Sequence, residues 1–339
     1  METKKKGTQT FALASPPSLA GFASVAGKKE GQGPLRESFD LIGQDTTFGE
    51  STWEKAESAM QQLALEKALE KAKQPMAAMD LLFAGDLLNQ CIAAGYSARK
   101  AARPFFGLYG ACSTMGEALA LAAMALDGGF GEWAAAVVSS HFCSAERQYR
   151  TPLEYGGQRT PTAQWTATAA GAAVLARAGE GPYITHVTVG KINDMGIKDA
   201  NNMGAAMAPA ACDTLLAHFA DTGRTPEDYD LILTGDLGML GRQLCKELLH
   251  REGLDLADRY NDCGCLLYDV EGQDVHCGAS GCGCSASVLC GFVLNGMKAG
   301  KWNRVLFCPT GALHSPVSLA QGESIPGICH AIALSNTIQ

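Results

Sequence analysis

The sequence predicts a duplicated α/β fold, arranged as a five-layered α/β/α/β/α sandwich, and two observations support this prediction. Stretches typical of helices and of short apolar strands alternate along the whole chain, with glycine and proline spread between them. The order of these stretches also repeats, because MDLLFAGDLL at 79–88 returns as YDLILTGDLG at 229–238. We therefore expect an N-terminal half, 1–182, and a C-terminal half, 183–339, built on one plan. Chance similarity between two ordinary α/β units is the alternative.

The composition indicates a large folded core and excludes several classes of partner. The 339 residues include 27 Lys and Arg against 35 Asp and Glu, which gives a net charge of −8, and 47% of them are hydrophobic. This acidic balance argues against nucleic acid as a partner, because binding to phosphates needs clustered Lys and Arg. No apolar run reaches the roughly 18 residues of a membrane span, and we find no secretory signal. We therefore expect a cytosol-like compartment in which the 13 cysteines are reduced.

The first half is expected to begin with a long helix. Residues 53–73 are rich in helix formers, and the stretch ends before Pro75. Ser51 and Glu54 have the spacing of a capping box at its start. The apolar run at 79–88 then predicts a buried strand.

A second strand of the first half leads directly into an apolar helix. The run PFFGLYGA at 104–111 is followed by a helical stretch at 112–129, which a glycine pair ends. Thr114 and Glu117 have the spacing of a second capping box. The segments WAAAVVSSH and GAAVLA after this helix are typical of strands.

The second half repeats the same pattern. Residues 206–220 are expected to be helical and to precede the repeated strand. The segment at 280–311 mirrors 111–140, with Trp302 at the place of Trp133. The strand segment repeats after 150 residues and the helix segment after 169. The second half therefore carries an insertion of 169 − 150 = 19 residues between its strand and its apolar helix. The two apolar helices are rich in Ala and Gly, which allow close approach, and we expect them in the middle layer.

Cys112 lies where a predicted strand turns into the apolar helix. Free N–H groups and the positive end of the helix dipole meet at such a turn, and they would lower the pKa of the thiol. This placement suits a nucleophilic cysteine, and it also suits a site that holds a carboxylate. A small buried residue that permits tight packing is the alternative.

A set of short motifs, in one order, resembles the stage V sporulation protein AD family of the thiolase and β-ketoacyl synthase superfamily. The resemblance extends from about residue 27 to residue 332. The motifs that carry it are GDLLNQ (85–90), GACST (110–114), DGGF (127–130), SSH (139–141), AERQ (145–148), EYGGQ (154–158), AMAPAA (206–211), LTGDL (233–237), NDCG (261–264), GCGCSAS (281–287) and TGAL (310–313).

The resemblance implies a duplicated thiolase-like fold and a specific ligand. That ligand is dipicolinic acid (pyridine-2,6-dicarboxylate), as the free acid or as its calcium chelate, with no other cofactor. The resemblance also implies membrane-embedded partner subunits that load the compound into the developing spore and release it at germination. The protein would then lie peripherally on the cytoplasmic face of the forespore inner membrane, and it would be a homodimer, as is common in the superfamily.

The same resemblance bears on whether the protein is an enzyme. Condensing enzymes of the superfamily combine the cysteine with a His and an Asn from the second half, whereas LTGDLG here puts Asp236 at the His position and GCGCSAS puts Cys282 at the Asn position. A carboxylate has no proton to donate and would repel a developing oxyanion, and a thiol is a weak donor. We therefore predict a binding protein without enzymatic activity. An acyl-CoA thiolase or β-ketoacyl synthase that uses Cys112 is the alternative.

A dianionic ligand needs hydrogen-bond donors, and the sequence offers three groups. These are the N–H groups at the start of the Cys112 helix, the loop of Gly281 and Gly283, and a nearby Arg147 or Arg150. The arginines could instead lie at a dimer interface or pair with neighbouring glutamates.

Four further polar residues are candidates for ligand binding, with structural alternatives. Asp86 and Asp236 occupy equivalent GDL positions, so both could cap the loop that follows, or accept from the ligand or hold calcium. His141 follows an apolar strand and could face the site or serve as a polar loop residue. His314 follows the TGAL motif, and we rank it lower.

Five cysteines fall within 22 residues, at 263, 265, 277, 282 and 284. They could bind zinc or an iron–sulfur cluster. Their C-x-C spacing differs from the C-x-x-C spacing of common zinc sites, so we predict no metal and interpret them as small packing residues.

Overall fold

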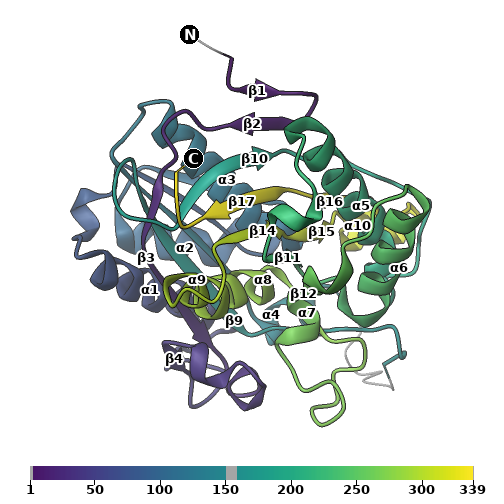
Figure 1. The fold of residues 1–339 in the computed structure, drawn as a ribbon. Helices are drawn as coiled ribbons and strands as arrows, with labels where there is room; N and C mark the ends of the chain where they lie inside the picture. Colours follow the sequence, from purple (N-terminus) through teal and green to yellow (C-terminus); the bar gives the residue numbers. More distant parts are fainter. Residues whose placement is uncertain (1–2, 150–158, 339) are drawn as a thin grey trace.

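The computed structural model describes residues 3–149 and 159–338, and its centre is a large mixed sheet flanked by helices (Figure 1). Ten strands follow one another across it, in the order β12–β11–β14–β17–β10–β3–β9–β7–β5–β6. The first half supplies β3 (Ser18–Ala26), β5 (Leu81–Gly85), β6 (Phe105–Leu108), β7 (Trp133–Ser140) and β9 (Ala169–Ala176). The second half supplies β10 (Tyr183–Thr188), β11 (Leu231–Thr234), β12 (Tyr260–Asp262), β14 (Arg304–Cys308) and β17 (Ala331–Ser335).

The strand order confirms the predicted duplication. From the centre of the sheet outward, the first half runs β3–β9–β7–β5–β6, and the second half runs β10–β17–β14–β11–β12. In chain order, both halves therefore place their first, fifth, fourth, second and third strands side by side. The repeated sequence segments lie on equivalent strands, β5 and β11. Each of them pairs with the fourth strand of its half, β5 with β7 and β11 with β14.

Along the run of ten strands, the two halves are joined by one pair of residues. Tyr183 on β10 pairs with Ser18 on β3 in antiparallel orientation, so the predicted two sheets are joined into one hydrogen-bonded sheet at that point. Short strands extend its margins: β1 (Lys5–Lys6) pairs with β2 (Thr10–Ala12), β2 with β10, and β4 (Leu41–Ile42) with β3.

Helices on three levels complete the layered architecture. The outer helices are α1 (Trp53–Ala72) and α2 (Ile92–Ala101) in the first half, and α5 (Met203–Thr222) and α6 (Gly238–Arg251) in the second, at opposite sides of Figure 1. The middle layer holds α3 (Thr114–Asp127) and the stretch formed by α8 (Cys282–Ser287), the π-helix η9 (Val288–Val293) and α9 (Leu294–Lys298). Helix α3 contacts first-half strands, α8 and second-half β17, which places it between the two halves.

The remaining elements lie around the ends of the strands. They are α4 (Phe142–Tyr149), β8 (Trp165–Thr166), α7 (Cys263–Leu266), β13 (Ala279–Ser280), β15 (Thr310–Ala312), α10 (Pro316–Ala320) and β16 (Gly327–Cys329). The inserted residues of the second half include α7 and β13, and β13 pairs with β8 of the first half.

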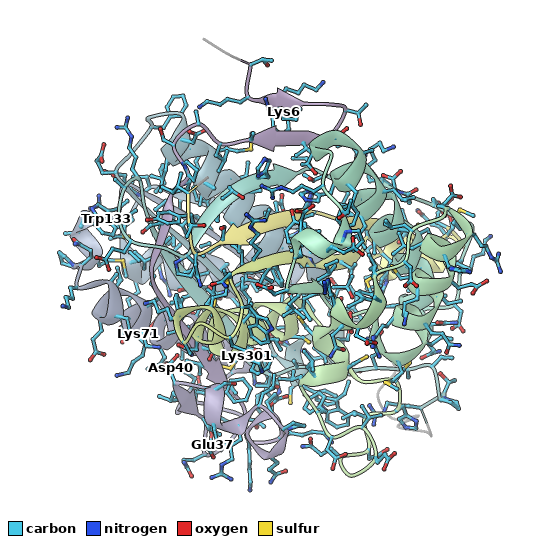
Figure 2. The ribbon with its side chains drawn as sticks, viewed as in Figure 1. Lys6, Glu37, Asp40, Lys71, Trp133 and Lys301 are labelled. Atoms are coloured by element: carbon cyan, nitrogen blue, oxygen red, sulfur yellow. The ribbon has the colours of Figure 1, made fainter. Side chains whose placement is uncertain are left out.

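The predicted start of the first helix is wrong by one residue. Thr52, rather than Ser51, is the N-cap of α1, and its hydroxyl accepts the N–H of Lys55 at 3.3 Å. An ion pair of 2.5 Å between Lys71 and Asp40 then ties the end of α1 to the chain that follows β3 (Figure 2). Because Asp40 also accepts the N–H of Ser24 on β3 at 2.9 Å, this carboxylate fixes the outer helix to the sheet.

Candidate functional site

The turn between β6 and α3 is tightly constrained. Ala111, just before Cys112, has a left-handed backbone with φ +49°, a conformation that costs free energy for a residue with a side chain. The hydroxyl of Thr114 donates to the carbonyl of Ala111 at 2.6 Å and accepts the N–H of Gly110 at 3.1 Å. Thr114 is thus inside this turn and is not the N-cap, so the predicted capping box with Glu117 is wrong.

Glycine is required opposite this turn as well. A Cβ atom on Gly311 of β15 would lie 2.4 Å from the carbonyl oxygen of Gly110 and 3.0 Å from the amide nitrogen of Ser113. The second half therefore approaches the Cys112 turn at backbone distance, and it does so from the strand that carries Thr310.

Asp236 lies against Cys112, as the sequence analysis expected for the two positions of one site. Its carboxylate accepts the N–H of Gly281 at 2.8 Å and the hydroxyl of Thr310 at 3.1 Å, and it interacts with the Cys112 thiol. The side chain is fully buried, and burial raises the pKa of Asp236 to about 7. A carboxyl group with this pKa exchanges its proton near neutral pH.

The thiol of Cys112 differs from the expectation. Burial raises its pKa well above the ordinary value, and the charge and hydrogen bonding of Asp236 raise it further. The predicted lowering of the pKa by the helix terminus is therefore wrong, because desolvation and a neighbouring carboxyl outweigh the helix dipole. At neutral pH this residue is a thiol.

Cys282 completes the predicted group. It starts α8, it is fully buried, and its Sγ donates to the carbonyl of Ser139 on β7 at 2.9 Å. Ser285, one turn further along α8, donates to the carbonyl of Cys112 at 3.5 Å. The starts of α3 and α8 therefore face each other, and the structure brings Cys112, Asp236 and Cys282 together.

Gly281 and Gly283 position this group with their backbones. The N–H of Gly281 donates to Asp236, and the N–H of Gly283 donates to the hydroxyl of Ser140 at 3.1 Å. Gly281 has φ +99°, and a Cβ on it would lie 2.7 Å from Oγ of Ser140, so only glycine fits there. Both N–H groups are engaged inside the chain, which leaves a positioning role for the two glycines.

Asp86 holds the loop that follows β5. Its two carboxylate oxygens accept the N–H groups of Leu88 and Ala94, each at 2.7 Å, so it fixes both the loop and the start of α2. Burial raises the pKa of Asp86 to about 6. This is the capping alternative that the sequence left open.

The two GDL aspartates are not structural twins. In the second half a different residue, Asp262 at the end of β12, accepts the N–H groups of Leu237 and Gly238, both at 3.0 Å. Asp236 is thereby released from capping its own loop and reaches across to Gly281.

His141 is held by backbone groups on both sides of its ring. Nε2 lies 2.7 Å from the carbonyl of Thr46, and Nδ1 accepts the N–H of Cys143 at 3.1 Å. Burial lowers the pKa of the imidazole, which is therefore neutral and donates to Thr46 from Nε2. Both ring nitrogens are occupied, which matches the structural alternative.

The two candidate arginines lie apart from the Cys112 group or outside the description. Arg147 is exposed and forms an ion pair with Glu54 of α1. Arg150 and the EYGGQ motif at 154–158 lie outside the described residues.

A pair of tyrosines stands beside the buried group, and the sequence analysis missed it. The hydroxyls of Tyr109 and Tyr149 lie 2.8 Å apart, and the ring of Tyr149 packs edge-on against His314 with centroids 5.3 Å apart. Burial raises the pKa of Tyr109 to about 12, and the groups of Cys112 and Cys282 are near enough to raise it further. Tyr109 is 41% exposed, so this pair connects the buried group to the surface.

Glu57 is a second missed residue. It projects from α1 into the protein, where the hydroxyls of Ser139 and Ser144 each donate to its carboxylate at 2.9 Å. Burial and the nearby Asp86 raise the pKa of Glu57 to about 8. The sequence contained one sign of this buried polar group: Gln61 follows Glu57 by one helical turn, on the same face of α1. Gln61 donates to Ser139 at 2.8 Å.

Among residues 3–149 and 159–338, no group of three or more His, Cys, Asp or Glu side chains is arranged to hold a metal ion. Across the same ranges no helix has both the length and the apolar character to cross a bilayer.

Comparison with known proteins identifies the family. The sequence profile of stage V sporulation protein AD matches residues 7–335. The chain is also 44% identical to stage V sporulation protein AD of Bacillus subtilis (strain 168) over 329 residues, which is 97% of each chain. The chain belongs to the stage V sporulation protein AD family.

Solved structures show the same fold at low identity. One is 3-oxoacyl-[acyl-carrier-protein] synthase III from Aquifex aeolicus VF5, with a TM-score of 0.57 and 13% identity over 94% of this chain and 99% of that chain. Another is a variant of OleA from Xanthomonas campestris, with a TM-score of 0.61 and 15% identity over 94% of this chain and 98% of that one. This member of the stage V sporulation protein AD family therefore has a thiolase-like fold.

Proposed function

We propose that this protein binds dipicolinic acid at the group formed by Cys112, Asp236 and Cys282, and that it does so without catalysis. The proposal rests on one observation above all: the thiol that would be the nucleophile lies against a buried carboxyl group. The family relationship supplies the context of sporulation.

The chemistry of the group supports binding over acyl transfer. A cysteine nucleophile reacts as the thiolate, and a base or a positive neighbour must stabilise that form. Here the neighbour is Asp236, whose negative charge opposes ionisation of Cys112. Cys282, on the other side, donates its weak hydrogen bond to Ser139 and offers no strong donor for an oxyanion.

The protonation of Asp236 supports an acidic ligand. A carboxyl group with a pKa of about 7 holds a proton in a large fraction of molecules near neutral pH. In that form it can donate a hydrogen bond to a ligand carboxylate, whereas the ionised form would repel it. The hydroxyls of Tyr109 and Tyr149 also lie beside the group, where Tyr149 donates to the carbonyl of Leu87 and Tyr109 therefore donates to Tyr149.

Titration with dipicolinate tests this proposal. We expect saturable heat in isothermal titration calorimetry of the full chain, with and without calcium to separate the chelate from the free acid. Asp236→Ala should abolish the heat, and Glu66→Ala, on the exposed face of α1, should leave it unchanged. Absence of heat with the wild-type protein at millimolar dipicolinate would overturn the proposal.

The enzymatic alternative has its own test. An acyl-CoA thiolase or synthase would transfer an acyl group to Sγ of Cys112 and release CoA thiol. Intact-mass spectrometry after incubation with acetyl-CoA would detect that adduct, with Cys112→Ser as the control. We expect no adduct on Cys112.

We further propose that the protein is a homodimer joined through β6. This strand ends the sheet, and among the described strands only β5 pairs with it. Its residues Phe105 and Phe106 are 37% and 54% exposed. An apolar edge strand favours pairing with another strand, and a second copy would provide the same strand around a twofold axis.

The cellular setting remains part of the proposal. We infer that the protein works beside membrane-embedded subunits that move dipicolinate, on the cytoplasmic face of the forespore inner membrane. The family relationship supports a role in sporulation. Co-purification of such subunits with tagged protein from sporulating cells, against a tagged Asp236→Ala control, would test the association.

A further inference from the structure

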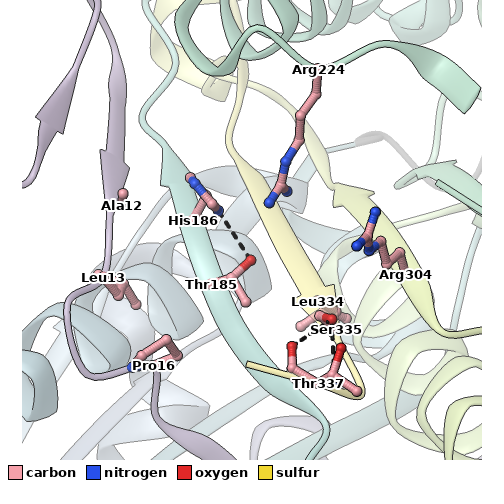
Figure 3. A pocket seen from close by; sticks show the side chains of 10 residues that line it. All are labelled: Ala12, Leu13, Pro16, Thr185, His186, Arg224, Arg304, Leu334, Ser335 and Thr337. Carbon is pink, nitrogen blue, oxygen red and sulfur yellow. Dashed lines mark hydrogen bonds between the residues drawn. The ribbon is translucent and has the colours of Figure 1, made fainter. Parts of the chain in front are cut away.

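A small cavity lies at the opposite end of β14 from the Cys112 group (Figure 3). Arg304 starts this strand, whereas Thr310, which contacts Asp236, follows its other end. The cavity has a volume of about 200 Å³, and β10, β17 and the chain between β2 and β3 form its walls. None of its lining residues belongs to the site described above.

Basic groups surround this cavity. Figure 3 shows the guanidinium groups of Arg224 and Arg304 and the imidazole of His186 around it. The hydroxyls of Thr185, Ser335 and Thr337 also line it. The chain has a net charge of −8, so basic side chains gathered around one cavity indicate a local function for them.

The two arginines are poorly neutralised. Arg304 has one carboxylate partner, Asp228, at 3.9 Å, and its side chain is 30% exposed. In the described parts of the chain, no carboxylate lies within 4.0 Å of the Arg224 guanidinium. Burial first, and then the charges of Arg224 and Lys6, lower the pKa of His186 to about 4, so the imidazole is neutral and the two arginines carry the positive charge at the cavity.

Arg224 is held in place by a chain of buried hydrogen bonds. Its Nη1 donates to the hydroxyl of Tyr229 at 2.9 Å, and that hydroxyl lies 2.6 Å from Nε2 of His218. Nδ1 of His218 lies 2.8 Å from the hydroxyl of Thr188, which lies 2.8 Å from that of Thr10. An arginine can only donate, so Tyr229 accepts from it and keeps its own proton to donate to Nε2 of His218.

The far end of the chain agrees with this direction. The hydroxyl of Thr10 donates to the carboxylate of Asp221, which also accepts the N–H of Gln9 at 2.8 Å. Burial lowers the pKa of His218 to about 3, so the ring is neutral and can accept at one nitrogen while it donates at the other. The guanidinium is therefore fixed before any ligand arrives, which lowers the entropic cost of binding.

We propose that this cavity binds a small oxyanion, a phosphate or carboxylate group, between Arg224 and Arg304. Guanidinium groups bind both kinds of group through paired hydrogen bonds. At about 30 Å³ per water molecule, 200 Å³ accommodates roughly six or seven waters, which suits a phosphate or a short diacid and excludes a nucleotide. The inference is independent of dipicolinate binding at Cys112.

Calorimetry of the full chain at low ionic strength tests the site, with inorganic phosphate in one arm and malonate in the other. We expect saturable binding of at least one anion. Arg224→Gln and Arg304→Gln should each weaken it at least about tenfold, since each removes a charge-assisted hydrogen bond to the anion. Arg251→Gln is the matched control, because Arg251 is exposed on α6 and pairs with Glu247 at 3.0 Å. Asp236→Asn should bind the anion as the wild type does.

Two outcomes would overturn the proposal. One is the absence of saturable heat with both anions, and the other is unchanged affinity in Arg224→Gln and Arg304→Gln proteins that melt like the wild type. Should either variant fail to fold, wild-type crystals soaked in selenate decide the question by anomalous scattering. A selenium peak between the two arginines is expected, and its absence there would refute the site.

Discussion

Asp236 and Gly281 are joined by a hydrogen bond of 2.8 Å from the glycine N–H to the carboxylate. This contact links the loop after β11 to the start of α8, and it orients the carboxyl toward Cys112. It thereby places a buried acid beside the thiol, and the proposed binding function rests on this arrangement.

The first prediction concerns the pH dependence of dipicolinate binding. Asp236 has a raised pKa of about 7, so it is protonated below that pH and charged above it. The affinity for an anionic ligand should therefore fall as pH rises from 6 to 8, by about tenfold per unit of pH at most. In Asp236→Asn, which is neutral throughout, the affinity should vary much less over that range. Calorimetry at pH 6, 7 and 8 would measure both profiles, and equal slopes would refute the assignment.

The second prediction concerns the reactivity of Cys112. Removing the neighbouring carboxyl should lower the pKa of the thiol, so Asp236→Asn should be alkylated by iodoacetamide at Cys112 several-fold faster than the wild type at pH 8. Peptide mapping by mass spectrometry separates Cys112 from the other cysteines. Cys290 is fully buried beyond this group and serves as the internal control, whose rate should not change. A rate at Cys112 that is the same in both proteins would contradict the proposed coupling.

The third prediction concerns Gly281. An alanine there would carry φ +99° and place its Cβ 2.7 Å from Oγ of Ser140. We expect Gly281→Ala to lose about 2–4 kcal/mol of unfolding free energy, from backbone strain and the clash together. Gly300→Ala is the control, because Gly300 has φ +75° but no atom near the site of its Cβ, and it should lose about 1 kcal/mol. Urea denaturation would measure both, and equal losses would mean that the contact with Ser140 has no effect.

The fourth prediction concerns the dimer. Phe106→Glu places a charge on the exposed edge strand β6, and it should shift the protein from dimer to monomer in light scattering coupled to gel filtration. Phe130→Glu is the matched control: Phe130 is 78% exposed in the turn after α3 and is not part of β6, and its variant should remain dimeric. A wild-type protein that is monomeric at micromolar concentration would refute the proposed interface.

Much of the architecture could be predicted from the sequence, because helices and strands leave patterns in short stretches of the chain. Apolar runs with fixed punctuation, such as the stretch that forms β5 and its repeat in β11, predict strands without knowledge of their neighbours. The helix that starts after Cys112 was predicted in the same way. The predictions of the N-cap residues were wrong, because the hydrogen bond of a single hydroxyl determines which residue is the N-cap. Thr52, rather than Ser51, caps α1, and the hydroxyl of Thr114 donates to Ala111 within its own turn.

The environment of the candidate site could not be predicted from local pattern. The pKa of Cys112 depends on burial and on Asp236, which is far away in the chain. The same holds for Asp262, which takes over the capping of the loop after β11 and so releases Asp236 for the site. Long-range contacts of this kind are set by the packing of the two halves, and neither periodicity nor motif spacing reports them.

The last prediction concerns Glu57 and the stability of the whole fold. Its pKa is raised from the ordinary 4.5 to about 8 in the folded protein. Between these values the folded protein holds a proton that the unfolded chain releases, so this group makes the free energy of unfolding fall as pH rises from about 5 to 8. Glu57→Gln keeps the hydrogen-bond acceptor for Ser139 and removes the ionisation, and it should lessen that fall by at least about 1 kcal/mol. Urea denaturation at pH 5.5 and pH 8 would measure the difference. Glu50→Gln, at an exposed position before α1, is the control and should keep the wild-type slope; a Glu57→Gln protein with that same slope would show that the buried glutamate does not govern it.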